Sequence, residues 1–178
     1  MNVEHRLARL EAESQIRQLV ARYCFAIDDR DLSAIAALFT DDAIIRSADG
    51  VMNASGIDAI MPMYRGRFEA LGPGAHYMHD IQIDFVGNGS EQARGRVSGH
   101  AELQRNGEMM VCALRYADTY RNTAQGWRMH EREISFLYYV PVADYPGILL
   151  SRDRNRAYAQ PMPADYPETL PGWTSTTR

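Results

Sequence analysis

Lysine is absent from this chain of 178 residues, and all 19 basic residues are arginine. A Schiff-base aldolase or a pyridoxal-phosphate enzyme needs an internal lysine amine to form its covalent adduct. Both classes of enzyme are therefore excluded. Any reaction that the chain catalyses has to use its acids, histidines, tyrosines and arginines.

Cysteine is scarce. The two cysteines, Cys24 and Cys112, each lie in an apolar stretch and form no Cys-x-x-Cys motif. This excludes a zinc ribbon or a disulfide framework, and both thiols are predicted to be small core residues. His76 and His79 form a His-x-x-His pair, but on a strand these two residues face opposite sides of the sheet and suit a shared metal poorly. No metal site is expected.

Long apolar runs and an excess of positive charge are also missing. Uncharged apolar runs such as Met109–Leu114 are far shorter than the ~20 residues of a membrane span. The N-terminal residues lack the basic-then-apolar pattern of a signal peptide. With a net charge of −4, the surface offers no general attraction for nucleic acid or anionic lipid. We expect a cytoplasmic protein with neither of these partners.

Periodicity predicts helices first and strands afterwards. Residues 4–28 repeat apolar side chains at steps of three and four without Gly or Pro, which is typical of an amphipathic helix. Shorter helices are predicted from Asp31 to Phe39 and from Ile57 to Leu71, and a strand begins at Ala43. From His76 to Val140, strands at 92–105, 108–121 and 127–140 are joined by hairpin-sized turns. This order predicts an α+β fold with helices on one face of a mainly antiparallel sheet.

Residues 141–178 differ in composition. Six of the eight prolines lie here, together with several tyrosines and Trp173. Proline at this density opposes both helix and central strand. We predict an extended tail, which either covers a pocket mouth or acts as an arm between subunits.

Four motifs in order along the chain resemble the SnoaL-like branch of the nuclear transport factor 2-like superfamily. The first is the segment from Tyr23 to Ala43, including Ala-Ile-Asp28-Asp. The others are His76-Tyr-Met-His-Asp80, Arg115-Tyr-Ala-Asp118 and Gly126-Trp-Arg-Met-His-Glu-Arg132. The resemblance implies that residues 1–140 form one conical half-barrel, in which a curved sheet and N-terminal helices enclose one pocket.

The resemblance also implies chemistry. Cofactor-free lyases of this superfamily, such as scytalone dehydratase, bile-acid 7α-dehydratase and lindane dehydrochlorinase, have an aspartate at the end of the first long helix and a histidine at the start of the main sheet. Asp28 and His76 occupy these positions, and Tyr23 matches a functional tyrosine of the bile-acid enzyme. A histidine oriented by a carboxylate is a base near neutral pH, and a pocket tyrosine can donate to a leaving group.

The choice between two histidines remains open. Strict alternation along the strand places His79 on the inward face with Tyr77, Ile81 and Ile83, whereas the family position favours His76. A bulge can change which face a side chain occupies. We assign catalysis to Asp28, His76, Tyr23 and Arg132. Further pocket candidates are Tyr64, His79, Arg115, Tyr116, His130 and Phe136.

These observations predict a cofactor-independent lyase that eliminates water, halide or formaldehyde from a small hydrophobic, aromatic substrate. An isomerase or epoxide hydrolase in the same pocket remains an alternative. A different class is a non-catalytic protein, either a ligand-binding domain or one resembling a dioxygenase β subunit. We expect a homodimer or homotrimer that uses no cofactor.

Overall fold

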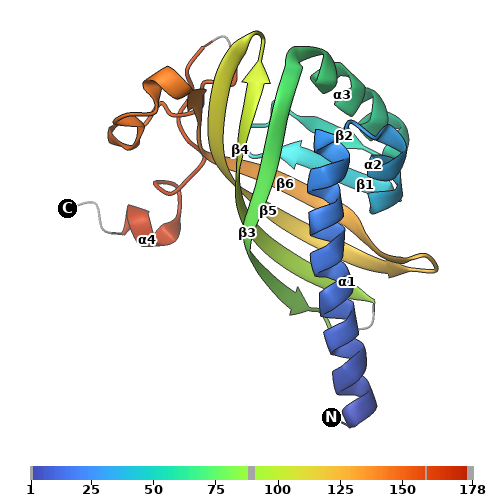
Figure 1. The fold of residues 1–178 in the computed structure, drawn as a ribbon. Coiled ribbons are helices and arrows are strands. Elements are labelled where there is room, and N and C mark those ends of the chain that lie inside the picture. The colour runs from blue at the N-terminus through green and yellow to red at the C-terminus, as the bar shows by residue number, and fades with distance from the viewer. Residues whose placement is uncertain (1, 88–90, 159, 176–178) are drawn as a thin grey trace.

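The computed structural model describes residues 2–87, 91–158 and 160–175 (Figure 1). Three helices and six strands form the main body, followed by a tail with short helical turns. The helices are α1 (Val3–Asp28), α2 (Leu32–Leu38) and α3 (Ile57–Ala70). The strands are β1 (Phe39–Ser47), β2 (Asn53–Ser55), β3 (Leu71–Phe85), β4 (Gln92–Arg105), β5 (Glu108–Thr123) and β6 (Gly126–Pro141).

Capping residues in the sequence set the start of α1 and the turn that follows its end. The Asn2 side chain caps it by accepting from the His5 amide at 2.9 Å, which satisfies one of the free N–H groups of the first turn. The helix stops after Asp28, and Arg30 takes a left-handed backbone with φ 57°. Asp31 then caps α2 by accepting from the Ala34 amide at 2.9 Å. The carboxylate at the end of α1 is thereby fixed at a turn between two helices.

The six strands form one curved sheet in the order β2-β1-β6-β5-β4-β3. Strands β3 to β6 pair antiparallel, as their short connections predict, and only β1 runs parallel to its neighbour β6. Figure 1 shows α1 lying across one face of this sheet, with α2 and α3 beside it. The α+β fold predicted from the sequence is confirmed.

The sheet is interrupted by register shifts that change the alternation of side chains. In β3 the register shifts between Met78 and Ile81, so that His79 and Asp80 together oppose one residue of β4. In β6 an extra residue, His130, is inserted where the register of β5 shifts between Thr119 and Tyr120. Such bulges reverse which residues face inward on the far side of the shift.

The tail packs against its own domain. It contains η1 (Val142–Asp144), η2 (Ile148–Leu150) and α4 (Pro171–Thr174). Its middle part pairs with β6 through two backbone hydrogen bonds. The Tyr139 amide donates to the Arg154 carbonyl at 2.8 Å, and the Arg156 amide donates to the Tyr139 carbonyl at 2.7 Å. This part of the tail is therefore held against β6 by backbone hydrogen bonds.

Within the described residues, none of the helices combines the length and the apolar character that crossing a bilayer requires.

Candidate active site

Asp28 and His76 form a close pair. One carboxylate oxygen, Oδ1, lies 2.6 Å from Nδ1 of the imidazole. The other oxygen, Oδ2, accepts the backbone N–H of the same histidine at 3.0 Å. A carboxylate can only accept, so Nδ1 carries a proton, and in the neutral form of the ring Nε2 then has the lone pair.

The fold holds this pair at the junction of two elements. Asp28 is the last residue of α1, and His76 lies near the start of β3. Both side chains are largely shielded, with 20% and 16% of their side-chain surface exposed. Because the bulge in β3 comes after His76, the histidine faces the helices, together with Met78, Ile81 and Ile83 of the same strand.

His76 lines a cavity between the helices and the concave side of the sheet, which we call the inner cavity. Most of the other side chains that line it are apolar or aromatic: Tyr23, Ile27, Met52, Tyr64, Arg67, Phe68, Leu71, Leu103, Cys112, Leu114, Tyr116, Ile134, Phe136 and Tyr139. Four sequence-based candidates, Tyr23, Tyr64, Tyr116 and Phe136, thus join His76 here. The space is about 30 Å³, enough for a water-sized group, whereas benzene needs a cavity of roughly 150 Å³.

Two tyrosine hydroxyls meet in this cavity. The Tyr23 and Tyr64 oxygens lie 2.9 Å apart. Burial raises the pKa of Tyr64 well above its ordinary value, so its phenol stays protonated at neutral pH. Burial likewise raises the pKa of Tyr116. The lining of the cavity therefore includes neutral phenols that can donate hydrogen bonds.

Arg132 does not line the cavity, which corrects its predicted direct role. Its guanidinium is fully buried and sits between the Tyr23 and Tyr116 rings, 4.2 and 3.9 Å from their centroids. It binds Asp118 through two hydrogen bonds of 2.8 and 2.7 Å, and Tyr120 donates to the same carboxylate at 2.7 Å. Arg132 packs against two tyrosines that line the inner cavity, and it can influence the cavity through them. Sequence reasoning did not place Asp118 in the interior.

His79 lies outside the cavity, contrary to the expectation from alternation. It is exposed on the other face of the sheet, where its Nε2 lies 2.6 Å from Nδ1 of His100. The two rings stack at 4.8 Å. The bulge at His79 and Asp80 explains the difference. Alternation counted back from Ile81 and Ile83 assigns His79 to the inward face only if the strand has no extra residue, and the bulge adds one.

Arg115 and His130 also lie on the outer face. Arg115 is exposed and stacks over the Tyr166 ring at 4.4 Å. Its neighbour Tyr116 faces inward, and consecutive residues of a regular strand cannot share a face. His130 is the extra residue of the β6 bulge, and its ring contacts Thr40 at 3.1 Å and Arg121 at 2.8 Å. Neither residue reaches the inner cavity.

A second cavity of about 390 Å³ adjoins the first, and we call it the outer cavity. The two share Met52, Arg67, Phe136 and Tyr139 in their walls. The tail contributes Ala157 and Tyr158 to the outer cavity. The tail thus forms part of the wall of the outer cavity.

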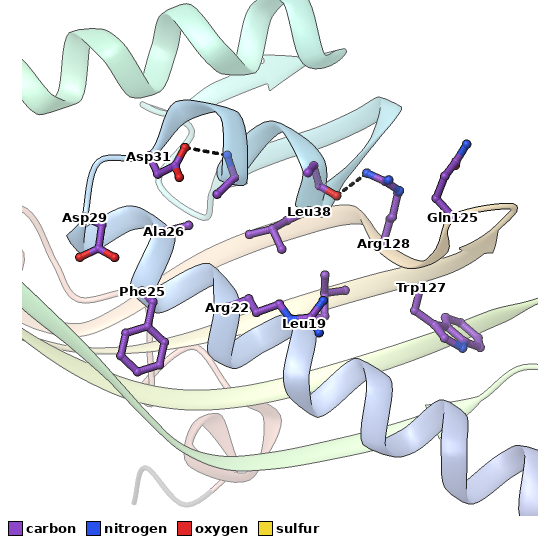
Figure 2. Close-up of a pocket in the computed structure, with 12 residues that line it drawn as sticks. Leu19, Arg22, Phe25, Ala26, Asp29, Asp31, Leu38, Gln125, Trp127 and Arg128 are labelled. Carbon is purple, nitrogen blue, oxygen red and sulfur yellow. Dashed lines mark hydrogen bonds between the residues drawn. The ribbon is translucent and has the colours of Figure 1, made fainter.

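A separate groove of about 490 Å³ runs between α1, α2 and the β6 hairpin (Figure 2). Asp29, Arg22 and Arg128 lie around it, with Phe25 at its edge, and Arg128 donates to the Ala37 carbonyl. Asp31 points to the Ala34 amide as a helix cap. No histidine is among the residues that line it. The groove is larger than the inner cavity but lacks a comparable acid–base pair.

Both cysteines are buried, as predicted. Burial raises the pKa of Cys24 to about 11 and that of Cys112 to about 12. Cys112 touches the inner cavity but stays a thiol at neutral pH, and only a thiolate is an effective nucleophile. In the part of the chain that the structure describes, no cluster of three or more His, Cys, Asp or Glu side chains is placed to hold a metal ion.

The fold and site define a class of protein: a helix-covered, curved-sheet domain with an Asp–His pair beside an aromatic cavity. Residues 8–133 match the model of the SnoaL-like domain. The chain belongs to this family, within the nuclear transport factor 2-like superfamily. No curated protein matches the sequence.

Several solved structures share the fold. A proposed scytalone dehydratase from Novosphingobium aromaticivorans is 22% identical, with a TM-score of 0.68 over 79% of this chain and 91% of that one. The hexachlorocyclohexane dehydrochlorinase LinA-type3 from Novosphingobium barchaimii is 18% identical, with a TM-score of 0.70 over 78% and 94%. A protein from N. aromaticivorans described as NTF2-like with a cystatin-like fold is 28% identical, with a TM-score of 0.62 over 76% and 88%.

Proposed function

We propose that this protein is a cofactor-independent lyase, which eliminates a small leaving group from a hydrophobic, aromatic substrate. The observation that carries the proposal is the Asp28–His76 pair, which is joined by two hydrogen bonds and whose histidine lines the inner cavity. The names of two structural relatives, a dehydratase and a dehydrochlorinase, describe reactions of this type.

His76 is the base in this scheme. Its Nε2 removes a proton from the carbon next to the one that bears the leaving group, and the electrons of the broken C–H bond form the new double bond. Asp28 keeps the ring oriented and stabilises the imidazolium that results. The leaving group departs with its bonding electrons. Where it is hydroxide, the imidazolium returns the proton and water is released.

Tyr23 and Tyr64 are the donors to the leaving group or to a neighbouring oxygen of the substrate. Their mutual hydrogen bond leaves one hydroxyl proton free to point into the cavity. Arg132 stacks on the Tyr23 ring and so places a positive charge close to this pair of hydroxyls. In a site with apolar walls, such interactions with developing negative charge are stronger than in water.

A ring-sized substrate requires the mouth to open. The inner cavity of about 30 Å³ does not admit a benzene ring. Met52 and Arg67 lie in the walls of both cavities and are joined by a 3.0 Å contact between Nη1 and Sδ. We infer that these two side chains separate when the substrate enters from the outer cavity.

The test is a screen of hydroxylated and halogenated aromatic compounds, with products identified by mass spectrometry and NMR. Wild-type protein should convert a member of this set with loss of water or halide, and His76→Ala should abolish the conversion. Isomerisation without loss of mass would indicate the alternative reaction. Unchanged turnover in both His76→Ala and Asp28→Asn would refute the assignment of the pair.

A further inference from the structure

The outer cavity gathers positive charge and unused hydrogen-bond donors. Arg67 and Arg105 both line it. Among the described residues, neither arginine has a carboxylate within ion-pair distance; Arg67 contacts the Met52 sulfur, and Arg105 lies 5.8 Å from the centroid of the Tyr139 ring. Arginines that face a cavity without a carboxylate partner are suited to bind an anion from outside.

Two polar atoms in this wall are buried and lack partners. The Tyr139 hydroxyl and Arg105 Nε are both shielded from solvent, and neither has a hydrogen bond of ordinary geometry in the described part of the chain. The Arg105 side chain is nevertheless close enough to the Tyr139 hydroxyl to lower its pKa slightly against the larger effect of burial. Tyr139 as a residue is only 3% exposed. A buried donor without a partner is unfavourable unless a ligand or water satisfies it.

The tyrosines here are donors at neutral pH. Burial raises the pKa of Tyr139 to about 12, and that of Tyr158 to about 12. The nearby carboxylate of Asp49 raises the pKa of Tyr158 by its charge and by accepting a hydrogen bond from the Tyr158 hydroxyl. It is also bonded to the Val51 amide at 3.0 Å and the Asn155 amide group at 3.2 Å. It therefore competes weakly for the two arginines.

We propose that the outer cavity binds a carboxylate of the substrate through Arg67, Arg105 and the hydroxyl of Tyr139. The substrate is then an aromatic acid, whose carboxylate stays in the outer cavity while its reacting carbon reaches His76 in the inner one. Planar guanidinium groups match a carboxylate in two-point contact. This inference rests on the proposed lyase function for the reacting end, but the anion site itself does not.

Binding can be measured without turnover. Isothermal titration calorimetry of wild-type protein at neutral pH compares 2-naphthoate with 2-naphthamide, which has the same ring system but no charge. The acid should bind at least about tenfold more tightly than the amide, as expected for a charge-assisted contact in a partly buried site. Equal affinity for the two compounds would overturn the proposal. This comparison needs no variant.

Variants locate the site. Arg67→Gln and Arg105→Gln should each weaken 2-naphthoate binding by about tenfold and leave 2-naphthamide unchanged. Arg65→Gln is the matched control, because Arg65 lies on the same helix as Arg67 but is exposed and lines neither cavity. Loss of acid binding in the control, or retention in both cavity variants, would place the anion elsewhere and contradict the assignment.

Two further arms separate this inference from the proposed function and from other anions. His76→Ala should abolish turnover and still bind 2-naphthoate, so that a lyase assignment can fail while the carboxylate site stands. Inorganic phosphate should compete with 2-naphthoate only weakly. Competition at comparable concentrations would show a phosphate site and overturn the assignment to a carboxylate.

Discussion

Asp28 binds His76 at two points, through the ring Nδ1 at 2.6 Å and through the backbone N–H at 3.0 Å. Each carboxylate oxygen is used once. The first contact sets the tautomer of the imidazole, and the second ties the start of β3 to the end of α1. A single side chain thus links the orientation of the proposed base to the packing of helix on sheet.

Asp28→Asn should lower kcat by about 100-fold or more while the protein remains folded. An amide offers one acceptor oxygen and one NH₂ group, so it cannot accept both the Nδ1 proton and the backbone N–H. Steady-state kinetics with the substrate found in the screen measures the change. Asp29→Asn is the control, since Asp29 is exposed and lines the separate groove. An equal loss in this control would show that the effect is not specific to the pair.

Tyr64→Phe and Tyr23→Phe separate the two hydroxyls of the cavity. Each removes one partner of the 2.9 Å hydrogen bond and keeps the ring. If Tyr23 is the donor to the substrate, Tyr23→Phe should reduce kcat by about tenfold to 100-fold and Tyr64→Phe by less. Unfolding free energies should fall by about 1 to 3 kcal/mol in each variant, because the remaining buried hydroxyl loses its partner. A larger kinetic loss in Tyr64→Phe would assign the donor role to that residue instead.

The fold could be predicted because its signals are local. Apolar residues at helical spacing fixed the extent of α1, Asp31 marked the start of α2, and hairpin-sized connections implied the antiparallel order of β3 to β6. Each of these features depends on residues close in the sequence. The parallel contact of β1 with β6 depends on distant residues, and the sequence did not predict it.

The site could be predicted only in part, because alternation fails at bulges. Asp28 and His76 were placed together by their resemblance to family positions, whereas strict alternation favoured His79. His130 was predicted to line the pocket, but it is the extra residue of the β6 bulge and lies outside the inner cavity. Arg67 was missed, although it lies three residues after Tyr64 on α3 and so shares its face. The spacing of three residues from Tyr64 was the signal that could have placed Arg67 on the same side of the helix.

The Arg132–Asp118 pair should be costly to break from either side. Both side chains have no exposed surface, so removing one leaves a buried charge without its partner. Asp118→Ala and Arg132→Ala should each reduce the unfolding free energy by about 3 to 5 kcal/mol. Urea denaturation measures this. The double variant, Asp118→Ala with Arg132→Ala, should lose less than the sum of the two single changes. Strict additivity would contradict the coupling.

Both thiols should be unreactive in the folded protein. The pKa values of about 11 for Cys24 and about 12 for Cys112 leave almost no thiolate at about pH 8, and burial blocks access. A colorimetric thiol reagent should therefore label neither cysteine in native protein and both in denaturant. Fast labelling of Cys112 in native protein would show that the inner cavity opens to solvent, since this residue lies in its wall.

The tail should be held to the domain by a pH-dependent ion pair. Arg154, only 2% exposed, binds both oxygens of Glu168 at 2.8 Å. Hydrogen bonding to this guanidinium lowers the pKa of Glu168 from 4.5 to about 2. A carboxyl whose pKa is lower in the folded state stabilises that state above the unfolded pKa, and its contribution disappears as the pH falls through the folded pKa.

Glu168→Gln should therefore be less stable than wild type at about pH 6, and the difference should shrink steadily below about pH 4.5. The Glu168 side chain is partly exposed, so solvent screening limits the difference at neutral pH to about 1 kcal/mol or less. Urea denaturation of both proteins between about pH 6 and about pH 3 measures the trend. A difference of the same size at both ends of this range would show that the charge of Glu168 does not hold the tail. In that case the three carbonyl contacts of Arg154, to Leu137, Ser151 and Tyr166, would be sufficient to fix the segment that carries Tyr158 to the outer cavity.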